Sequence, residues 1–324
     1  MEYANFLVAI KEAVQNMMGD EVTVTITSIR KNNGITLDGM LIARKERGIS
    51  PAYYVNNQYQ AMLEGKAIAA IAEEIVDLYE RSDFPHQLNL EFFNSAEEMK
   101  SNVLYKLIHF QKNRELLNDL PHLRFMDLAI VFFCNLSEEY FENGSVLIHN
   151  RHVERWNLTA EELYQSAQLN TMRLCPETII DMEEVMRGVF IRRLKDKIGT
   201  DEGGEELLKR FMEEQYPNLA EKEFKQAKGR YKMYVLGNED RLFGAAAMLY
   251  PGVLDRFSDE MGLGLFLLPS SVHEIIIVPD DGSMDKDELQ QIVSEINDNH
   301  VDPEEVLGYT IYYYDRHSKE ILQV

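Results

Sequence analysis

The chain has 324 residues, of which 45% are hydrophobic and 27% are charged. This length suits two domains of about 150 residues, or one domain with a large insertion. The composition excludes disordered, collagen-like and mucin-like classes. With 33 basic and 55 acidic residues, the formal net charge is −22. That balance argues against binding to nucleic acid or to anionic membranes, because both need basic surface on the protein.

The apolar runs, the N-terminal segment and the cysteines indicate where in the cell the protein is expected. No apolar run approaches the roughly 18 residues that a transmembrane helix needs, and the N-terminus lacks the basic segment of a signal peptide. The two cysteines, Cys134 and Cys175, form neither a CxxC motif nor a disulfide framework. We therefore expect a cytoplasmic protein.

In the N-terminal third, apolar residues at helical spacing predict an opening helix over residues 3–18. Residues 22–26 alternate with period two, and an apolar pattern resumes over residues 35–43 after a turn at Asn33 and Gly34, which predicts a β-hairpin. A short extended piece follows at residues 52–55. Helices are then expected over residues 59–79 and, after a Ser95 N-cap, over residues 95–117.

The middle of the chain begins with a continuously apolar run at residues 128–133, which indicates a strand buried on both faces. Asn143 and Gly144 predict a turn before a strand at residues 145–149. Thr159 and Glu162 form a capping-box pattern that opens a helix to about residue 169. After Pro176 a charged helical segment is expected to about residue 228, interrupted by a mobile loop at residues 199–204.

The final section contains three predicted strands, at residues 233–236, 263–268 and 274–278, with a helical or turn segment through residue 247. Helices are expected between Pro251 and Gly262 and over residues 285–299, and a hairpin of residues 309–314 and 320–324 closes the chain. Strand-strand-helix patterns recur at residues 22–79, 124–169 and 263–299, although they do not align residue by residue.

Together these elements predict an α+β protein with mixed, largely antiparallel sheets built from strand-strand-helix units. We expect an N-terminal α+β domain at residues 1–120. A C-terminal α+β domain at residues 121–324 would carry the charged helical insertion at about residues 176–230.

Searches for cofactor and metal motifs are negative. The sequence has no GxxxxGK[ST] phosphate loop, no GxGxxG after a strand and no GxSxG elbow. His273 and Glu274 begin an HExxH pattern, but Ile277 stands where the second histidine is required. His149 and His152 fall at a predicted strand end, where they would point to opposite faces. We therefore predict neither a cofactor nor a metal ion.

One polar cluster remains as a candidate site. Ser270, Ser271, His273 and Glu274 are predicted to form a Pro-initiated turn between two buried strands, and turns of this kind often carry function. Asp315 and Arg316 occupy a second turn.

The structural interpretation of these residues is favoured over the functional one. Serines after proline are ordinary turn residues, and a histidine entering a strand usually bonds locally. The Tyr312–Tyr314 run is expected to pack across neighbouring strands. The basic stretch at residues 187–197 is expected to be a solvated helix face.

Several segments resemble one known family. They are residues 233–236 (MYVL), 243–246 (FGAA), 267–274 (LLPSSVHE) and 312–316 (YYYDR), with 31–34 (KNNG) near the N-terminus. In these segments the sequence is similar to the DUF5688 family, found mainly in gut Firmicutes, and the resemblance extends over nearly the whole chain. It implies a bacterial cytoplasmic setting. The family has no established catalytic residues, so the resemblance implies no activity.

Two functional hypotheses follow. The favoured one is a cytoplasmic, non-catalytic binding or regulatory protein that engages another protein, because cofactor motifs are absent and acidic residues are dispersed. The alternative is a small hydrolase or transferase with its site at the turn of residues 270–274, joined by Asp315 and Arg316. It requires His273 within about 3.2 Å of a serine hydroxyl or a bound water. Acidic mimicry of nucleic acid has less support, because the carboxylates are spread along the chain.

Overall fold

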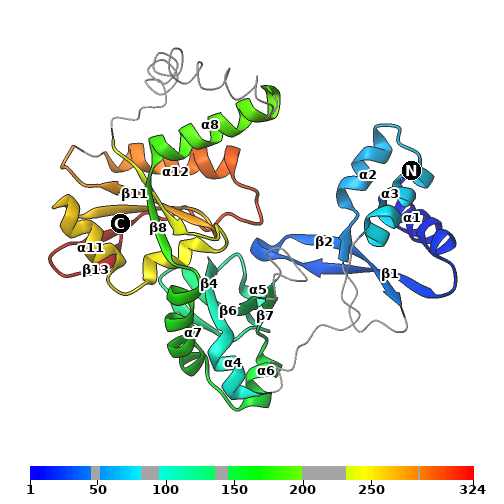
Figure 1. The fold of residues 1–324 in the computed structure, drawn as a ribbon, viewed down its shortest axis with the longest axis horizontal. Coiled ribbons are helices and arrows are strands. Elements are labelled where there is room, and N and C mark those ends of the chain that lie inside the picture. The colour runs from blue at the N-terminus through cyan, green and yellow to red at the C-terminus, as the bar shows by residue number, and fades with distance from the viewer. Residues whose placement is uncertain (45–51, 82–94, 136–144, 199–230, 284) are drawn as a thin grey trace. The chain divides into compact units, whose positions relative to one another are not determined.

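A computed structural model describes residues 1–44, 52–81, 95–135, 145–198, 231–283 and 285–324 (Figure 1). The chain divides into two compact units, each discontinuous in sequence. Unit 1 comprises Met1–Leu104, Phe110–Leu123 and Val131–Ala167; unit 2 comprises Tyr105–His109, Arg124–Ile130 and Gln168–Val324. The predicted turn at Asn143 and Gly144, the loop at residues 199–204 and the helical segment beyond residue 198 lie outside the described residues.

The first sheet of unit 1 follows the sequence prediction closely. The predicted opening helix and hairpin are confirmed, and Asn33 and Gly34 take φ of 59° and 73° in the turn. The helix predicted over residues 59–79 is instead two helices, because Gly65, at φ 104°, breaks it. The elements are α1 (Tyr3–Met18), β1 (Val22–Arg30), β2 (Thr36–Arg44), β3 (Ala52–Tyr54), α2 (Asn56–Leu63) and α3 (Ile68–Arg81), and the sheet order is β1-β2-β3.

The helix predicted over residues 95–117 is wrong beyond its first two turns. Ser95 caps α4 (Ala96–Asn102) by accepting the Glu98 N–H, as predicted. The chain then forms strand β4 (Val103–His109) and a short helix α5 (Arg114–Leu117). Nearly all of β4 is buried, so its pairing within a sheet overrides the local helical preference.

The second sheet has the order β4-β6-β5, with β7 paired to β6. Strand β6 is buried on both faces, as its apolar run predicts. The capping box of α7 is also confirmed, since Glu162 accepts the Thr159 N–H at 2.9 Å and Thr159 accepts the Glu162 N–H at 3.2 Å. The elements are β5 (His122–Phe125), β6 (Leu128–Asn135), β7 (Ser145–Leu147), α6 (Asn150–Trp156) and α7 (Ala160–Leu174).

The third sheet lies in unit 2 and pairs six strands antiparallel in the order β13-β12-β10-β11-β9-β8. The sequence predicted helix where β8 begins; instead Thr178, Ile179 and Ile180 pair with β9 and form an edge strand. The elements are β8 (Glu177–Asp181), α8 (Met182–Ile198), β9 (Tyr234–Asn238), the 3-10 helix η3 (Gly244–Leu249), α11 (Val253–Met261), β10 (Leu265–Ser271), β11 (Glu274–Pro279), α12 (Lys286–His300), β12 (Tyr312–Asp315) and β13 (Glu320–Gln323).

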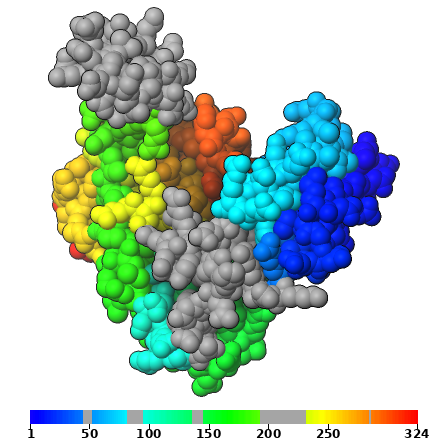
Figure 2. All heavy atoms as spheres, turned by 45° about the vertical axis from the view of Figure 1, so that its right-hand side comes forward, coloured from blue at the N-terminus to red at the C-terminus, as the bar shows by residue number. Residues whose placement is uncertain are grey.

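Helices cover both faces of this sheet. On one face Leu289 and Val293 of α12 pack into a core that includes Ile276. Helix α8 lies beside α12 on that face, as the green and orange elements of Figures 1 and 2 show. On the opposite face Phe257 of α11 meets Tyr234 of β9, with ring centroids 4.9 Å apart.

Antiparallel sheets combined with helices confirm the α+β class. The three strand-strand-helix segments predicted from the sequence belong to three different sheets, so they do not share one. Tyr313 packs against its cross-strand neighbour Phe266, as predicted, with centroids 5.0 Å apart. Within the described ranges, every helix falls short of the length and apolarity needed to cross a membrane.

The core of unit 2 generates a first prediction. Ile276 is 3% exposed and lies in the α12 core, so Ile276→Ala is expected to lower the free energy of unfolding by about 2–5 kcal/mol through cavity formation. Leu322, 44% exposed on the edge strand β13, is a matched control, and its alanine variant should lose about 0.5 kcal/mol or less. Denaturant midpoints and m-values measure both losses. Equal losses would contradict the assignment of Ile276 to the core.

Candidate functional site

The hairpin between β10 and β11 is tighter than the sequence predicts. Pro269, Ser270 and Ser271 belong to strand β10, and Ser271 pairs directly with Glu274. Only Val272 and His273 form the turn. The two serines are 4% and 7% exposed, so they are buried strand residues rather than an exposed turn. The expectation of a turn over all of residues 270–274 is therefore corrected.

Backbone hydrogen bonds hold this hairpin end on two sides. Val272 donates its N–H to the Glu305 carbonyl at 2.8 Å, and the Ser270 carbonyl accepts the Leu307 N–H at 3.2 Å. On the other side, the Val272 carbonyl accepts the Ala245 N–H of η3 at 3.4 Å. The turn is thus fixed between η3 and the segment that follows α12.

The imidazole of His273 is held by groups other than the serine hydroxyls. Its Nδ1 accepts the Phe243 N–H at 3.1 Å, so in the neutral ring the proton sits on Nε2. Nε2 lies 3.4 Å from Oε1 of Glu305. The ring also stacks on Phe243 with centroids 5.6 Å apart. Ser271 Oγ accepts the backbone N–H of His273 rather than contacting its ring. Both ring nitrogens therefore have structural partners.

His273 and Glu274 line a cavity of about 620 Å³ on the sheet face that α8 covers. The register of β8, β9 and β11 explains the cavity floor, because residues paired across strands share one face. Thr178 pairs with Gly237 and Ile180 with Val235, and the same register places Glu274 beside Gly237. Helix α8 forms the roof, and the loop after β9 forms one end. The lining residues are Thr178, Ile180, Glu184, Val185, Arg187, Gly188, Val189, Ile191, Arg192, Val235, Gly237, Asn238, Glu239, Arg241, His273 and Glu274.

Two glycines leave room in this cavity. Gly188 lies on the roof, where an added Cβ would meet no atom within 4 Å. Gly237 lies on the floor, where an added Cβ would approach nothing closer than the His273 carbonyl at 3.5 Å. A larger side chain at either position would occupy volume that is now open.

The loop between β9 and η3 is held in an uncommon backbone conformation. Arg241 and Phe243 both take φ of 55°, which is rare for residues with side chains. The buried amide of Asn238 binds the loop twice, donating to the Leu242 carbonyl at 2.8 Å and accepting the Leu242 N–H at 3.1 Å. Such strained conformations persist where surrounding contacts fix them, often beside ligand sites.

Burial dominates the electrostatics of Glu274. Loss of solvent raises the pKa of its carboxyl group, and the nearby charges of His273 and Arg241 offset only part of this effect. A carboxyl group with a raised pKa, at the end of a cavity, is the kind of group that binding and catalytic sites contain.

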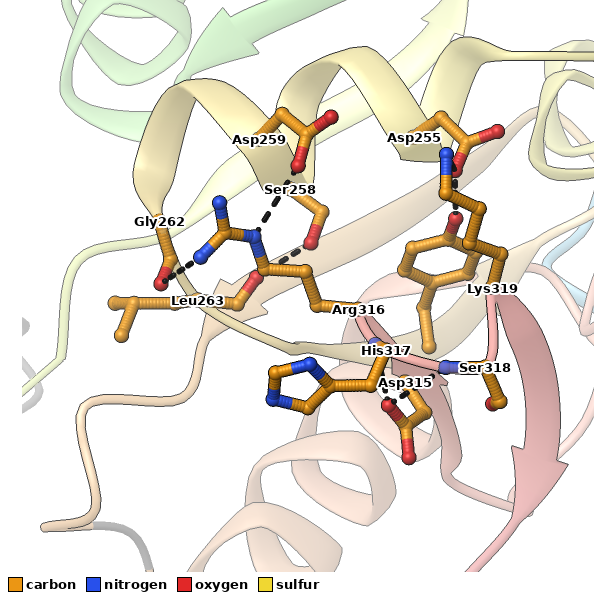
Figure 3. A network of polar contacts seen from close by, with 11 residues as sticks. Asp255, Ser258, Asp259, Gly262, Leu263, Asp315, Arg316, His317, Ser318 and Lys319 are labelled. Carbon is orange, nitrogen blue, oxygen red and sulfur yellow. Dashed lines mark hydrogen bonds and ion pairs between the residues drawn. The ribbon is translucent and has the colours of Figure 1, made fainter.

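Asp315 and Arg316 lie in a different place (Figure 3). Arg316 Nε lies 3.2 Å from Asp259 of α11, and its Nη1 donates to the Gly262 carbonyl at 3.0 Å. Asp315 accepts the His317 N–H within the β12–β13 turn.

The pairing of β12 with β10 separates these two residues from His273. Tyr314, the residue before Asp315, pairs with Leu265 at the start of β10, whereas Ser271 ends that strand. At about 3.3 Å per residue, the two ends lie roughly 20 Å apart. The structure brings His273 and Glu274 together but leaves Asp315 and Arg316 at the other end of the strand.

His149 and His152 also differ from the prediction. They do not end a strand on opposite faces; they begin helix α6, where His152 Nδ1 accepts the His149 N–H at 3.1 Å. The pair is a capping arrangement for a helix N-terminus. Across the described part of the chain, no group of three or more His, Cys, Asp or Glu side chains is arranged to hold a metal ion.

A family model, described as a family of unknown function, matches residues 3–316. The chain belongs to DUF5688. Comparisons with curated proteins and with solved structures give no match. Membership therefore assigns no chemistry to the cavity of this DUF5688 protein, whose function has to be argued from its geometry.

Sequence reasoning identified two lining residues, His273 and Glu274, but missed the rest. Arg187 and Arg192 of the basic stretch are exposed, as predicted, and they also line the cavity. Gly188 within a helix and Gly237 within a strand were the available signals, because glycine inside such elements often marks close approach or open space.

Gly244 and Gly237 differ in the space around them, so alanine substitutions at these two positions should differ in their effect on stability. A Cβ at Gly244 would lie 2.6 Å from the His273 carbonyl oxygen and 2.7 Å from the Asn238 nitrogen. Both are backbone atoms, so Gly244→Ala should cost about 1–3 kcal/mol of stability. Gly237→Ala, which meets only ordinary contacts, should change stability by about 0.5 kcal/mol or less. Thermal or chemical unfolding compares the variants; equal losses would contradict the close packing at Gly244.

The raised pKa of Glu274 predicts a pH-dependent stability. The folded chain keeps this proton to higher pH than the unfolded chain, so the free energy of unfolding should fall as pH rises from about 4.3 through the raised pKa. Glu274→Gln removes that component, so its stability relative to the native sequence should increase across this range. Unfolding at several pH values tests this, with the exposed rim variant Glu239→Gln as control. A constant difference across the range would contradict the prediction.

Proposed function

We propose that this DUF5688 protein is a non-catalytic ligand-binding or regulatory protein of the bacterial cytoplasm, and that the cavity beneath α8 is its binding site. The cavity itself is the observation that carries this proposal. Its volume of about 620 Å³ falls within the range of small-molecule pockets, about 300–1,000 Å³. Its lining combines aliphatic side chains, among them Ile180, Val185 and Val235, with the charged side chains of glutamate and arginine residues.

The arrangement of Ser270, Ser271 and His273 supports binding rather than nucleophilic catalysis. A nucleophilic serine needs a base within hydrogen-bond reach of its hydroxyl and a place for substrate beside it. Both serines are buried and neither lines the cavity. His273 uses Nδ1 for the Phe243 N–H and presents Nε2 to Glu305. The hydrolase or transferase alternative retains only Glu274 as a titratable group with a raised pKa in the cavity.

Helix α8 is the element through which occupancy of the cavity would reach a protein partner. It forms the roof of the cavity, and no side chain between Met182 and Arg192 is fully buried. Met186, on the same helix, is 36% exposed and does not line the cavity. A ligand that packs against α8 therefore acts on a helix that is partly exposed to solvent.

A neutral apolar fluorophore tests the proposal. We expect 1-N-phenylnaphthylamine to bind saturably to the full-length protein with a stoichiometry near one. Gly188→Phe should fill the cavity and abolish this binding, while improving local helix propensity. Met186→Phe, which adds a similar ring to the same helix outside the cavity, should leave binding unchanged. Absent binding, or equal effects of the two substitutions, would overturn the proposal.

A further inference from the structure

The arginines that line the cavity differ from Arg256 and Arg316 of unit 2. Arg256 and Arg316 form ion pairs with Glu177 and Asp259, at 2.5 and 3.2 Å. By contrast, Arg187, Arg192 and Arg241 line the cavity, and none of them forms an ion pair within the described part of the chain. The chain contains 55 acidic residues and only 33 basic ones, so carboxylate partners are abundant.

Arg241 has a role within the protein that the other two lack. Its charge acts on the carboxyl group of Glu274 and favours the ionised form. Arg187 and Arg192, both on α8, have no comparable carboxylate on the cavity floor. Glu184 and Glu239 also line the cavity; like Arg187 and Arg192 they are exposed, and none of the four forms an ion pair within the described part of the chain.

Two guanidinium groups that line a cavity and form no ion pair within the described residues favour a ligand with a negative charge. Arginine presents several donors in a planar fork and binds carboxylate or phosphate oxygens with charge-assisted hydrogen bonds. Both arginines are exposed, so the charged group of a ligand can reach them from solvent.

The remaining lining residues define the other part of the ligand. Ile180 and Val235 lie side by side on the floor, and Val185, Val189 and Ile191 of α8 also line the cavity. These aliphatic surfaces offer no hydrogen-bonding side chains, so the body of the ligand that lies between them is apolar.

We propose that the cavity binds an amphipathic anion, with an apolar body between α8 and the sheet and a carboxylate or phosphate group at Arg187 and Arg192. This inference rests on the proposed ligand-binding function and specifies its ligand class. Carboxylates and phosphate monoesters share the required chemistry.

Four ligands with the same ten-carbon chain test the inference by displacing bound 1-N-phenylnaphthylamine below their micelle-forming concentrations. They are decanoate, decyl phosphate, decanol and decylamine. Decanoate or decyl phosphate should bind about tenfold or more tightly than decanol, as expected for hydrogen bonds to a charged group. The stronger of the two anions identifies the head group. Decylamine should bind most weakly.

Arginine variants show whether the preference for anionic ligands depends on Arg187 and Arg192. In the double variant Arg187→Gln/Arg192→Gln, the preference for the anion should fall to about threefold or less, while the neutral fluorophore still binds and so reports an intact cavity. Arg173→Gln, an exposed position on α7 outside the cavity, is the matched control and should keep the full preference.

These experiments distinguish failure of the anion inference from failure of the proposed ligand-binding function. If the fluorophore binds and Gly188→Phe blocks it, but the four ligands bind equally or decylamine binds best, the anion inference is overturned and the ligand-binding proposal stands. The inference also fails if the double variant keeps the anion preference. If the fluorophore does not bind the native protein, the proposed function itself fails.

Discussion

The hydrogen bond from the Phe243 N–H to Nδ1 of His273 connects two loops that close one end of the cavity. One loop follows β9 and contains two residues in the left-handed region; the other is the two-residue turn between β10 and β11. The bond holds the strained loop in place and fixes the histidine tautomer. It also removes from His273 the lone pair that a general base would use, so the same contact that shapes the cavity argues against catalysis by that residue.

The sequence predicted elements well where local interactions determine them. The Asn33–Gly34 turn, the Thr159–Glu162 capping box and the doubly buried strand β6 each depend on neighbouring residues or on an unbroken apolar run. It failed at β4 and β8, whose residues form strands because distant segments pair with them. Helical propensity is a local property, so it does not reveal that a distant strand will pair with a segment.

The same distinction applies to the candidate site. His273 and Glu274 were identified because a polar pair next to apolar strands is visible in one short segment. Their surroundings come from elsewhere: Phe243 from the loop after β9, Glu305 from the segment after α12, and the roof from α8. Asp315 and Arg316 lie in a turn of the same kind, yet strand direction places them at the far end of β10. The distance between these two turns depends on the order and direction of the strands in the sheet, and a local sequence pattern does not reveal that order.

The boundary between the two units has a consequence for dissecting the protein. It passes through β4 after Leu104 and through β6 after Ile130, so each of these strands contributes residues to both units. A single break in the chain therefore cannot release either unit as a continuous fragment. A truncation at residue 120, the predicted domain border, would leave β4 without its neighbour β6 and expose its backbone groups. Dividing the chain at this position would therefore separate paired strands of the second sheet.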